Sequence, residues 1–192
     1  MFKMKQIIFA LCAVMMVNAV FAAPSDPSGL TLVDLTSPDG EVTSSRAVFV
    51  TGPQTAFNDH TSLNDNNNRL CIQSKAVDIV YKFETPTVVN SYRIYNFFNN
   101  KNYEQKTACK ARAPRSWTFL GSNDGIDWVL LDEQPWETGW DIGEARFYLT
   151  GNEVAYRYYK IDITNNNGNE YLQFAKLEYY NADTSSLPNF LT

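Results

Sequence analysis

The chain has 192 residues, of which 44% are hydrophobic and 19% are charged, and its formal net charge is −5. This length fits one domain that can bury a sizeable core. The acidic balance disfavours nucleic acid and anionic membranes as partners.

The first 22 residues have the pattern of a secretory signal peptide. Lys3 and Lys5 precede an apolar run from Ile7 to Val17, and small residues follow at Ala19, Ala22 and Ala23. The run is shorter than the roughly 20 apolar residues that a membrane-spanning helix needs. We therefore expect a secreted protein, with residues 1–22 removed and residues 23–29 forming a flexible entry segment. Loss of the two lysines leaves 14 basic and 21 acidic residues, a net charge of −7.

Removal of the signal peptide leaves two cysteines, Cys71 and Cys109. An even number of cysteines in an exported chain favours a disulfide, which would close a long loop and stabilise the fold by roughly 4 kcal/mol. The alternative is two free, buried thiols. A zinc site is disfavoured, because the chain has a single histidine and no Cys-x-x-Cys spacing.

Apolar residues alternate with polar ones along most of residues 30–181, and Gly, Pro, Asn or Asp interrupts them every ten or so residues. The clearest alternating runs are Val77 to Phe83, Tyr92 to Phe97 and Tyr159 to Thr164, and an apolar run from Leu172 to Tyr180 closes the pattern. Period-two alternation with frequent turn residues is typical of an all-β antiparallel sandwich. We expect no long helix, and we expect residues 182–192 to be a flexible tail.

The segment from Arg112 to Asp132, RAPRSWTFLGSNDGIDWVLLD, predicts a β-hairpin. Trp117 and Phe119 alternate with polar or solvent-side neighbours, an Asn-Asp-Gly turn follows, and an apolar strand resumes at Trp128. Trp117 and Trp128 are expected in the core. The words P-x-SW, GSNDG and W-x-x-LD resemble the central hairpin of the discoidin, or coagulation-factor type C, domains, whose relatives include carbohydrate-binding module family 32. This resemblance implies a jelly-roll sandwich of the galactose-binding type that binds ligands through loops and has no catalytic activity.

The same resemblance implies a structural calcium site. The turn Ala56-Phe-Asn-Asp-His-Thr-Ser62 is similar to the family's AFDN-x-T turn, which holds calcium together with a glutamate of the last strand. Calcium takes oxygen ligands, and the implied ligands here are Ala56, Asn58, Asp59, Thr61 and Glu178. Asn58 stands where an aspartate is usual, and a neutral amide weakens a calcium site. The alternative is a turn held by its own Asn and Asp side chains.

The segment from Asn99 to Arg115 has five basic residues and one acid, Glu104, a local charge of +4 in an acidic protein. We interpret it as a loop between two strands, and the family resemblance implies that this loop contacts sugar. Guanidinium and amide groups hydrogen-bond hydroxyls and carboxylates, so the leading candidates are Asn99, Asn100, Arg112 and Arg115. The local excess of positive charge favours acidic glycans. The alternative is a solvated loop that balances the acidic surface.

Two further loops are candidates for the same rim. Trp136 and Trp140 lie in QPWETGWDIG, a Pro- and Gly-rich loop, where an exposed aromatic face suits a sugar ring; the alternative is a tryptophan folded back as a lid. The segment Asn165-Asn-Asn-Gly-Asn-Glu170 is similar to the family's T-x-NNG, although turn formation alone explains it.

An enzyme is disfavoured, because His60 is the single histidine and there is no Gly-x-Ser-x-Gly motif. A carboxylate pair for glycoside hydrolysis is a spatial arrangement that sequence does not reveal. The leading hypothesis is a secreted glycan-binding module. The alternatives are an adhesion domain that binds proteins or the cell surface and, less favoured, a phospholipid-binding domain.

Overall fold

The computed structural model describes residues 30, 32–37, 39–48, 52–58, 63, 69–99 and 101–184. The predicted signal peptide (1–22) and entry segment (23–29) lie outside this part of the chain, as do Asp59, Thr61, Asn100 and residues 185–192 of the predicted tail.

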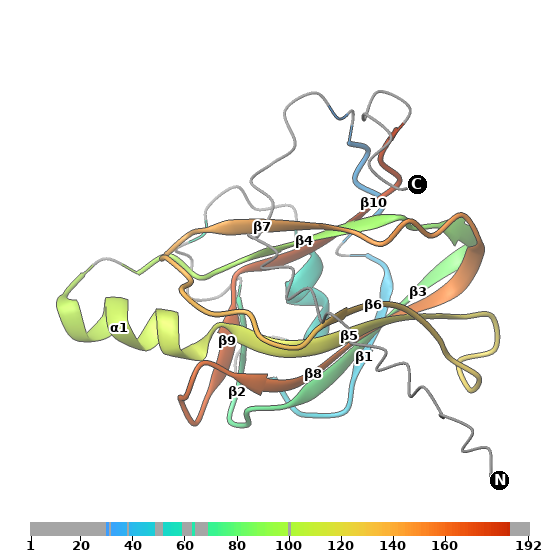
Figure 1. Ribbon diagram of the computed structural model, residues 1–192. Coiled ribbons are helices and arrows are strands. Elements are labelled where there is room, and N and C mark those ends of the chain that lie inside the picture. The colour runs from blue at the N-terminus through green and yellow to red at the C-terminus, as the bar shows by residue number, and fades with distance from the viewer. Residues whose placement is uncertain are drawn as a thin grey trace, which may run out of the picture.

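The fold is an antiparallel β-sandwich (Figure 1), as the alternating pattern predicts. One face is a five-stranded sheet in the order β1-β3-β8-β5-β6, and the other is a three-stranded sheet in the order β10-β4-β7. A two-stranded ribbon, β2-β9, lies at one end. The bounds are β1 Glu41–Ser44, β2 Leu70–Ile72, β3 Val77–Val88, β4 Ser91–Tyr95, β5 Pro114–Ser122, β6 Val129–Gln134, β7 Ala145–Leu149, β8 Ala155–Asn166, β9 Leu172–Phe174 and β10 Lys176–Tyr180.

Aromatic rings fill the space between the two sheets. Tyr92 of β4 stacks on Phe119 of β5, with 4.6 Å between ring centroids, and on Tyr148 of β7 at 5.0 Å. A hydrogen-bond chain pairs polar atoms of this layer, since Trp117 Nε1 donates to the Tyr92 hydroxyl, which donates to Asp132 Oδ2. Each such ring removed from water contributes roughly 1.5–3 kcal/mol, so this layer holds the two sheets together.

The predicted hairpin is confirmed as β5 and β6, which pair antiparallel. Gly125 has φ of +75°, a conformation in which an L side chain is strained. The expectation of two core tryptophans holds for one of them. Trp117 is 2% exposed, whereas Trp128, which lies just before the edge strand β6, is partly exposed, and the Lys160 ammonium lies 4.3 Å from the centre of its ring.

The segment expected to be a loop contains a ten-residue helix, α1, Tyr103–Arg112. Asn102 caps it by accepting a hydrogen bond from the Gln105 amide at 2.8 Å, and basic residues occupy the last turn, where the helix dipole favours them. The helix ends before Pro114, which disfavours helical backbone in the residue that precedes it. In Figure 1, α1 projects from the end of the sandwich at which β2 and β9 lie.

The closing apolar run is divided between two sheets. Leu172–Phe174 pairs with β2, and Lys176–Tyr180 pairs with β4, so the chain changes sheet at Ala175. The Ala175 amide donates to the Tyr95 carbonyl at 2.8 Å, which anchors this crossing. The β2-β9 ribbon is thereby held directly beside α1.

Candidate functional site

One face of α1 borders a cavity of about 410 Å³ at the end of the sandwich. Residues spaced three or four apart face it, because that spacing repeats one side of a helix. Its lining consists of Arg69, Asn99, Lys101, Glu104, Gln105, Ala108, Cys109, Arg112 and Gln173. We call this cavity the α1 pocket.

Gln173 supplies an amide to this pocket from a buried position. It sits in β9 opposite Cys71 of β2, and its side chain is on the other side of the ribbon from Leu172 and Phe174, which are in the core. Gln173 is 1% exposed. Its Oε1 accepts from Arg112 Nη1 at 3.1 Å, while its Nε2 has no hydrogen-bond partner among the described residues. A buried donor without a partner is costly, and a ligand in the pocket would remove that cost.

Arg112 is held in place by three residues of the stretch 169–173. Besides Gln173, Asn169 accepts from its Nε at 3.3 Å, and the ring of Tyr171 lies under its guanidinium at 5.1 Å. Asn169 belongs to the Asn165-to-Glu170 segment, so that loop positions a basic side chain of the α1 pocket. A guanidinium fixed in this way loses little rotamer freedom when it binds a ligand.

The predicted disulfide is absent: Cys71 and Cys109 are both free thiols and both buried. Each has its own surroundings, since Cys71 Sγ faces Gln173 Oε1 at 3.9 Å and Cys109 packs against Phe97 and Ala175. Burial raises the pKa of both thiols, and the guanidiniums of Arg69 and Arg112 partly oppose this rise. Arg69 and Arg112 both line the α1 pocket together with Cys109.

Arg115 and Trp136 pair with each other outside the α1 pocket. The Arg115 guanidinium lies 4.2 Å from the centre of the Trp136 ring, which is 66% exposed. Trp136 therefore has the exposed aromatic surface that was expected of this loop. Its contact with a ligand stays a prediction.

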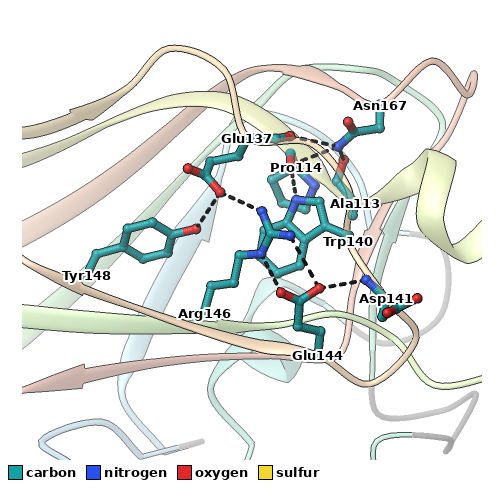
Figure 2. Close-up of polar contacts among 9 residues, drawn as sticks. All are labelled: Ala113, Pro114, Glu137, Trp140, Asp141, Glu144, Arg146, Tyr148 and Asn167. Atoms are coloured by element: carbon teal, nitrogen blue, oxygen red, sulfur yellow. Dashed lines mark hydrogen bonds and ion pairs between the residues drawn. The ribbon is translucent and has the colours of Figure 1, made fainter. Parts of the chain in front are cut away.

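Trp140 is part of the interior, as the alternative of a tryptophan folded back as a lid predicts. It is 2% exposed, and its Nε1 donates to the Pro114 carbonyl at 2.8 Å. Figure 2 shows the Arg146 guanidinium against this ring, 4.1 Å from its centroid. The buried cation and the indole close the loop over the end of the sheet, so Trp140 exposes almost none of its ring.

A buried ionic network supports the same loop (Figure 2). Arg146 donates from Nη1 to Glu137 at 2.6 Å and from Nε to Glu144 at 2.8 Å, and the Tyr148 hydroxyl donates to Glu137 at 3.3 Å. Burial and the nearby Glu137 carboxylate raise the pKa of Tyr148, which keeps its hydroxyl a donor. Asn167 adds hydrogen bonds to the carbonyls of Ala113, Pro114 and Glu137. These contacts fix loop 135–144 against β5 and the end of α1.

A second cavity, of about 310 Å³, lies on the opposite side of α1. It is lined by Thr107, Lys110, Ala111, Gly139, Trp140 and Asn167. Lys110 is paired with Asp141 at 2.5 Å. The helix thus separates two hollows, and the α1 pocket has the larger set of cationic and amide donors.

The implied calcium ligands that the structure describes do not form a cation site as they stand. Asn58 is buried, and its Nδ2 donates to the carbonyls of Thr55 and Ala175, so an N–H group faces the oxygens that would coordinate a metal. Glu178 is paired with Lys176 Nζ at 2.5 Å and accepts from the hydroxyls of Tyr95 and Tyr180. Asp59 and Thr61 lie outside the described residues. Calcium binding stays a prediction.

Sequence reasoning placed Asn99 and Arg112 in the site, and the structure brings them to one pocket. Arg69, Lys101 and Gln173 were missed as ligand candidates, although they line the same pocket. The one sequence signal for Gln173 was an amide between apolar neighbours in a strand. Within the described ranges, no three His, Cys, Asp or Glu side chains gather as a metal site, and no helix is long and apolar enough to cross a membrane.

No protein-family model and no curated protein sequence matches the chain. Solved structures do match its fold. A family 32 carbohydrate-binding module of Clostridium perfringens NanJ, in complex with galactose, has a TM-score of 0.57 at 11% identity, covering 79% of this chain and 99% of that one. A Streptococcus pneumoniae fucose-binding module has 0.56 at 13% identity, covering 78% and 95%. The AlyQ family 32 module, in complex with 4,5-unsaturated mannuronic acid, has 0.52 at 13% identity, covering 72% and 92%.

The chain therefore has the galactose-binding-like, discoidin-type sandwich of family 32 carbohydrate-binding modules. The resemblance first seen in the hairpin is confirmed at the level of the fold. At 11–13% identity these structures establish the fold alone.

Proposed function

We propose that this chain is a non-catalytic carbohydrate-binding module that takes a sugar into the α1 pocket. The observation that carries the proposal is a 410 Å³ cavity that combines guanidinium, ammonium and amide groups with the unpartnered Nε2 of Gln173. Ligand pockets generally have volumes of about 300–1,000 Å³ and a few placed polar groups. The ligands of the structural neighbours, which are galactose, fucose and an unsaturated uronic acid, support the same class of ligand.

We also propose that the chain is exported, on the basis of Lys3, Lys5 and the apolar run Ile7 to Val17. An exported module can reach extracellular or surface glycans. Mass spectrometry of the protein from a culture medium or periplasm would test this, since cleavage should leave Ala23 at the N-terminus. A protein that stays in the cytosol with its first residues intact would contradict it.

Two variants of α1 test the location of the sugar. Ala108 lines the α1 pocket, whereas Ala111, on the other side of the helix, lines the smaller cavity. A tryptophan in place of either residue fills one hollow without changing the charge. On a glycan array followed by calorimetry, Ala108→Trp should abolish sugar binding and Ala111→Trp should retain it.

Two results would speak against the proposal. An array with no bound glycan would contradict the function. A sugar that binds equally well to Ala108→Trp would contradict the site. Retained circular dichroism and melting temperature in both variants ensure that a loss of binding is local rather than a loss of the fold.

A further inference from the structure

The α1 pocket collects positive charge in a protein that is otherwise acidic. Arg69, Lys101 and Arg112 line it, and Glu104 is the one carboxylate among its described lining residues. The whole chain, in contrast, has a net charge of −5. Cations placed in one concave site repel one another unless an anion binds between them. A positively charged pocket on an acidic protein also attracts anions to a surface that otherwise repels them.

Arg112 is arranged so that part of its guanidinium is committed to the protein and part is left for a ligand. Nε donates to Asn169 and Nη1 donates to Gln173, and these are two of the five N–H donors of an arginine. The Tyr171 ring lies against the guanidinium at 5.1 Å. The side chain is thus fixed before a ligand arrives, and its remaining donors suit a carboxylate, which takes two parallel N–H bonds.

Gln173 provides an independent sign that the pocket takes an acceptor. Its side chain is almost completely buried, its Oε1 is used by Arg112, and its Nε2 is a donor with no partner in the described part of the chain. A neutral N–H donor beside a cation is satisfied by an oxygen that has free lone pairs. A carboxylate has four such lone-pair sites, so it can serve both groups at once.

The N-terminal half of α1 acts in the same direction. Lys101 and Asn99 lie just before the helix, where its dipole is positive. Asn99 also faces the pocket, so a hydroxyl-binding amide stands beside the cationic groups. Amides next to guanidiniums match a molecule that has hydroxyls and a carboxylate on one ring.

From this geometry we infer that the α1 pocket is specific for a carboxylate-bearing sugar, with Arg112, Arg69 and the Gln173 amide as the groups that select its carboxylate. The inference rests on the proposed function and adds the class of sugar. A uronate and a sialate present the same chemistry, and the experiment separates them. The unsaturated mannuronic acid bound by the AlyQ module is consistent with this class.

Calorimetry on the chain from Ala23 onward would use four probes: trigalacturonate, sialyllactose, neutral galactotriose and lactose. We expect one of the acidic probes to bind at least tenfold more tightly than its neutral counterpart. The preference should decline as salt rises from about 20 mM to about 300 mM, because exposed charge interactions are screened. Sodium sulfate at matched ionic strength should not displace the acidic sugar more than sodium chloride does.

Three substitutions locate the selectivity. Arg112→Ala and Arg69→Ala should each lower affinity for the acidic probe about tenfold or more while changing that for the neutral probe little. Gln173→Leu, which nearly keeps the shape but removes both the amide donor and the oxygen that accepts from Arg112, should also lower affinity for the acidic probe. Arg157→Ala is the matched control, because it removes an exposed arginine that lines a different cavity, beside β3.

The outcomes separate the inferred class of sugar from the proposed sugar-binding function. Equal binding of neutral and acidic sugars would overturn the inference and leave the proposed function in place, whereas no binding of any sugar would overturn both. Retained acid preference in Arg69→Ala and Arg112→Ala, or displacement by sulfate alone, would also overturn the inference. Selective loss in these variants with retention in Arg157→Ala would support it.

Discussion

The guanidinium of Arg146 lies over the buried ring of Trp140, 4.1 Å from its centroid, and the same guanidinium is paired with Glu137. Both partners of the ion pair are buried, with side-chain exposures of 8% and 11%. The pair therefore has little screening by water, and each charge depends on the other. The contact joins β7 to loop 135–144 and so holds one wall of the second cavity.

Arg146→Met should destabilise the protein by about 3–5 kcal/mol, because it leaves the Glu137 carboxylate buried without its cation. Urea denaturation followed by fluorescence would measure this. Lys82→Met is the matched control, since Lys82 pairs with a largely exposed Glu41, and such a pair contributes about 1 kcal/mol or less. Equal effects of the two substitutions would show that the buried network contributes no more than a surface pair.

The two loop tryptophans should behave differently when replaced by alanine. Trp140→Ala removes a buried ring and should cost about 3–5 kcal/mol. Trp136→Ala removes an exposed ring and should change the stability by about 0.5 kcal/mol or less. If Trp136 also stacks on sugar, as the sequence predicts, Trp136→Ala should weaken glycan binding measured by calorimetry. Unchanged affinity would remove Trp136 from the site.

Much of the sandwich could be predicted from the sequence, because a strand with one buried face alternates visibly, as Val77, Ile79 and Tyr81 do. The helix α1 could not, since it lies on the surface and only Cys109 within it is buried. A helix with so little apolar surface shows no apolar period, and its charged residues resemble those of a loop.

The residues that line the α1 pocket could not be predicted from the sequence for another reason. Arg69 and Gln173 are about a hundred residues apart and meet because Cys71 pairs with Gln173 across β2 and β9. Strand pairing at that separation is set by the whole fold rather than by local sequence. Trp140 is a similar case: its loop composition allowed either an exposed ring or a ring folded back as a lid, and the cation of Arg146, a residue of β7, covers it.

Asn58 allows a direct test of calcium. Its amide N–H group already donates to the Thr55 and Ala175 carbonyls, so the predicted calcium site requires this side chain to rearrange, and a melting temperature that is the same in millimolar calcium and in EDTA would contradict that prediction. Asn58→Asp would replace that donor by a carboxylate and leave three oxygen groups facing one another. This variant should be less stable in EDTA and should regain stability with calcium by mass action. A rise in the melting temperature of the unmodified protein with calcium would show that these ligands rearrange around the ion.

Lys176 and Glu178 should give the stability of the protein a specific pH dependence. Burial acts to raise the pKa of Glu178, but hydrogen bonds from Lys176, Tyr180 and Tyr95 outweigh it and hold that pKa below its ordinary value of 4.5. A carboxyl with a lowered folded pKa stabilises the fold above its unfolded pKa, and this contribution is lost as pH falls through the folded value.

Lys176→Met should reverse this dependence. Without the ammonium, burial becomes the larger influence and raises the pKa of Glu178, so the charged carboxylate destabilises the fold near neutral pH. We expect a loss of about 3 kcal/mol there, and the difference from the unmodified protein should shrink as pH falls below the ordinary pKa and the carboxyl is protonated in both. Urea denaturation from neutral pH down to about pH 3 would measure it. The double variant Lys176→Met/Glu178→Gln has no titrating group at either position, so the pH profile of its own stability should lack any contribution from Glu178. A difference between Lys176→Met and the unmodified protein that stays constant with pH would show that this pair is not the source of the dependence.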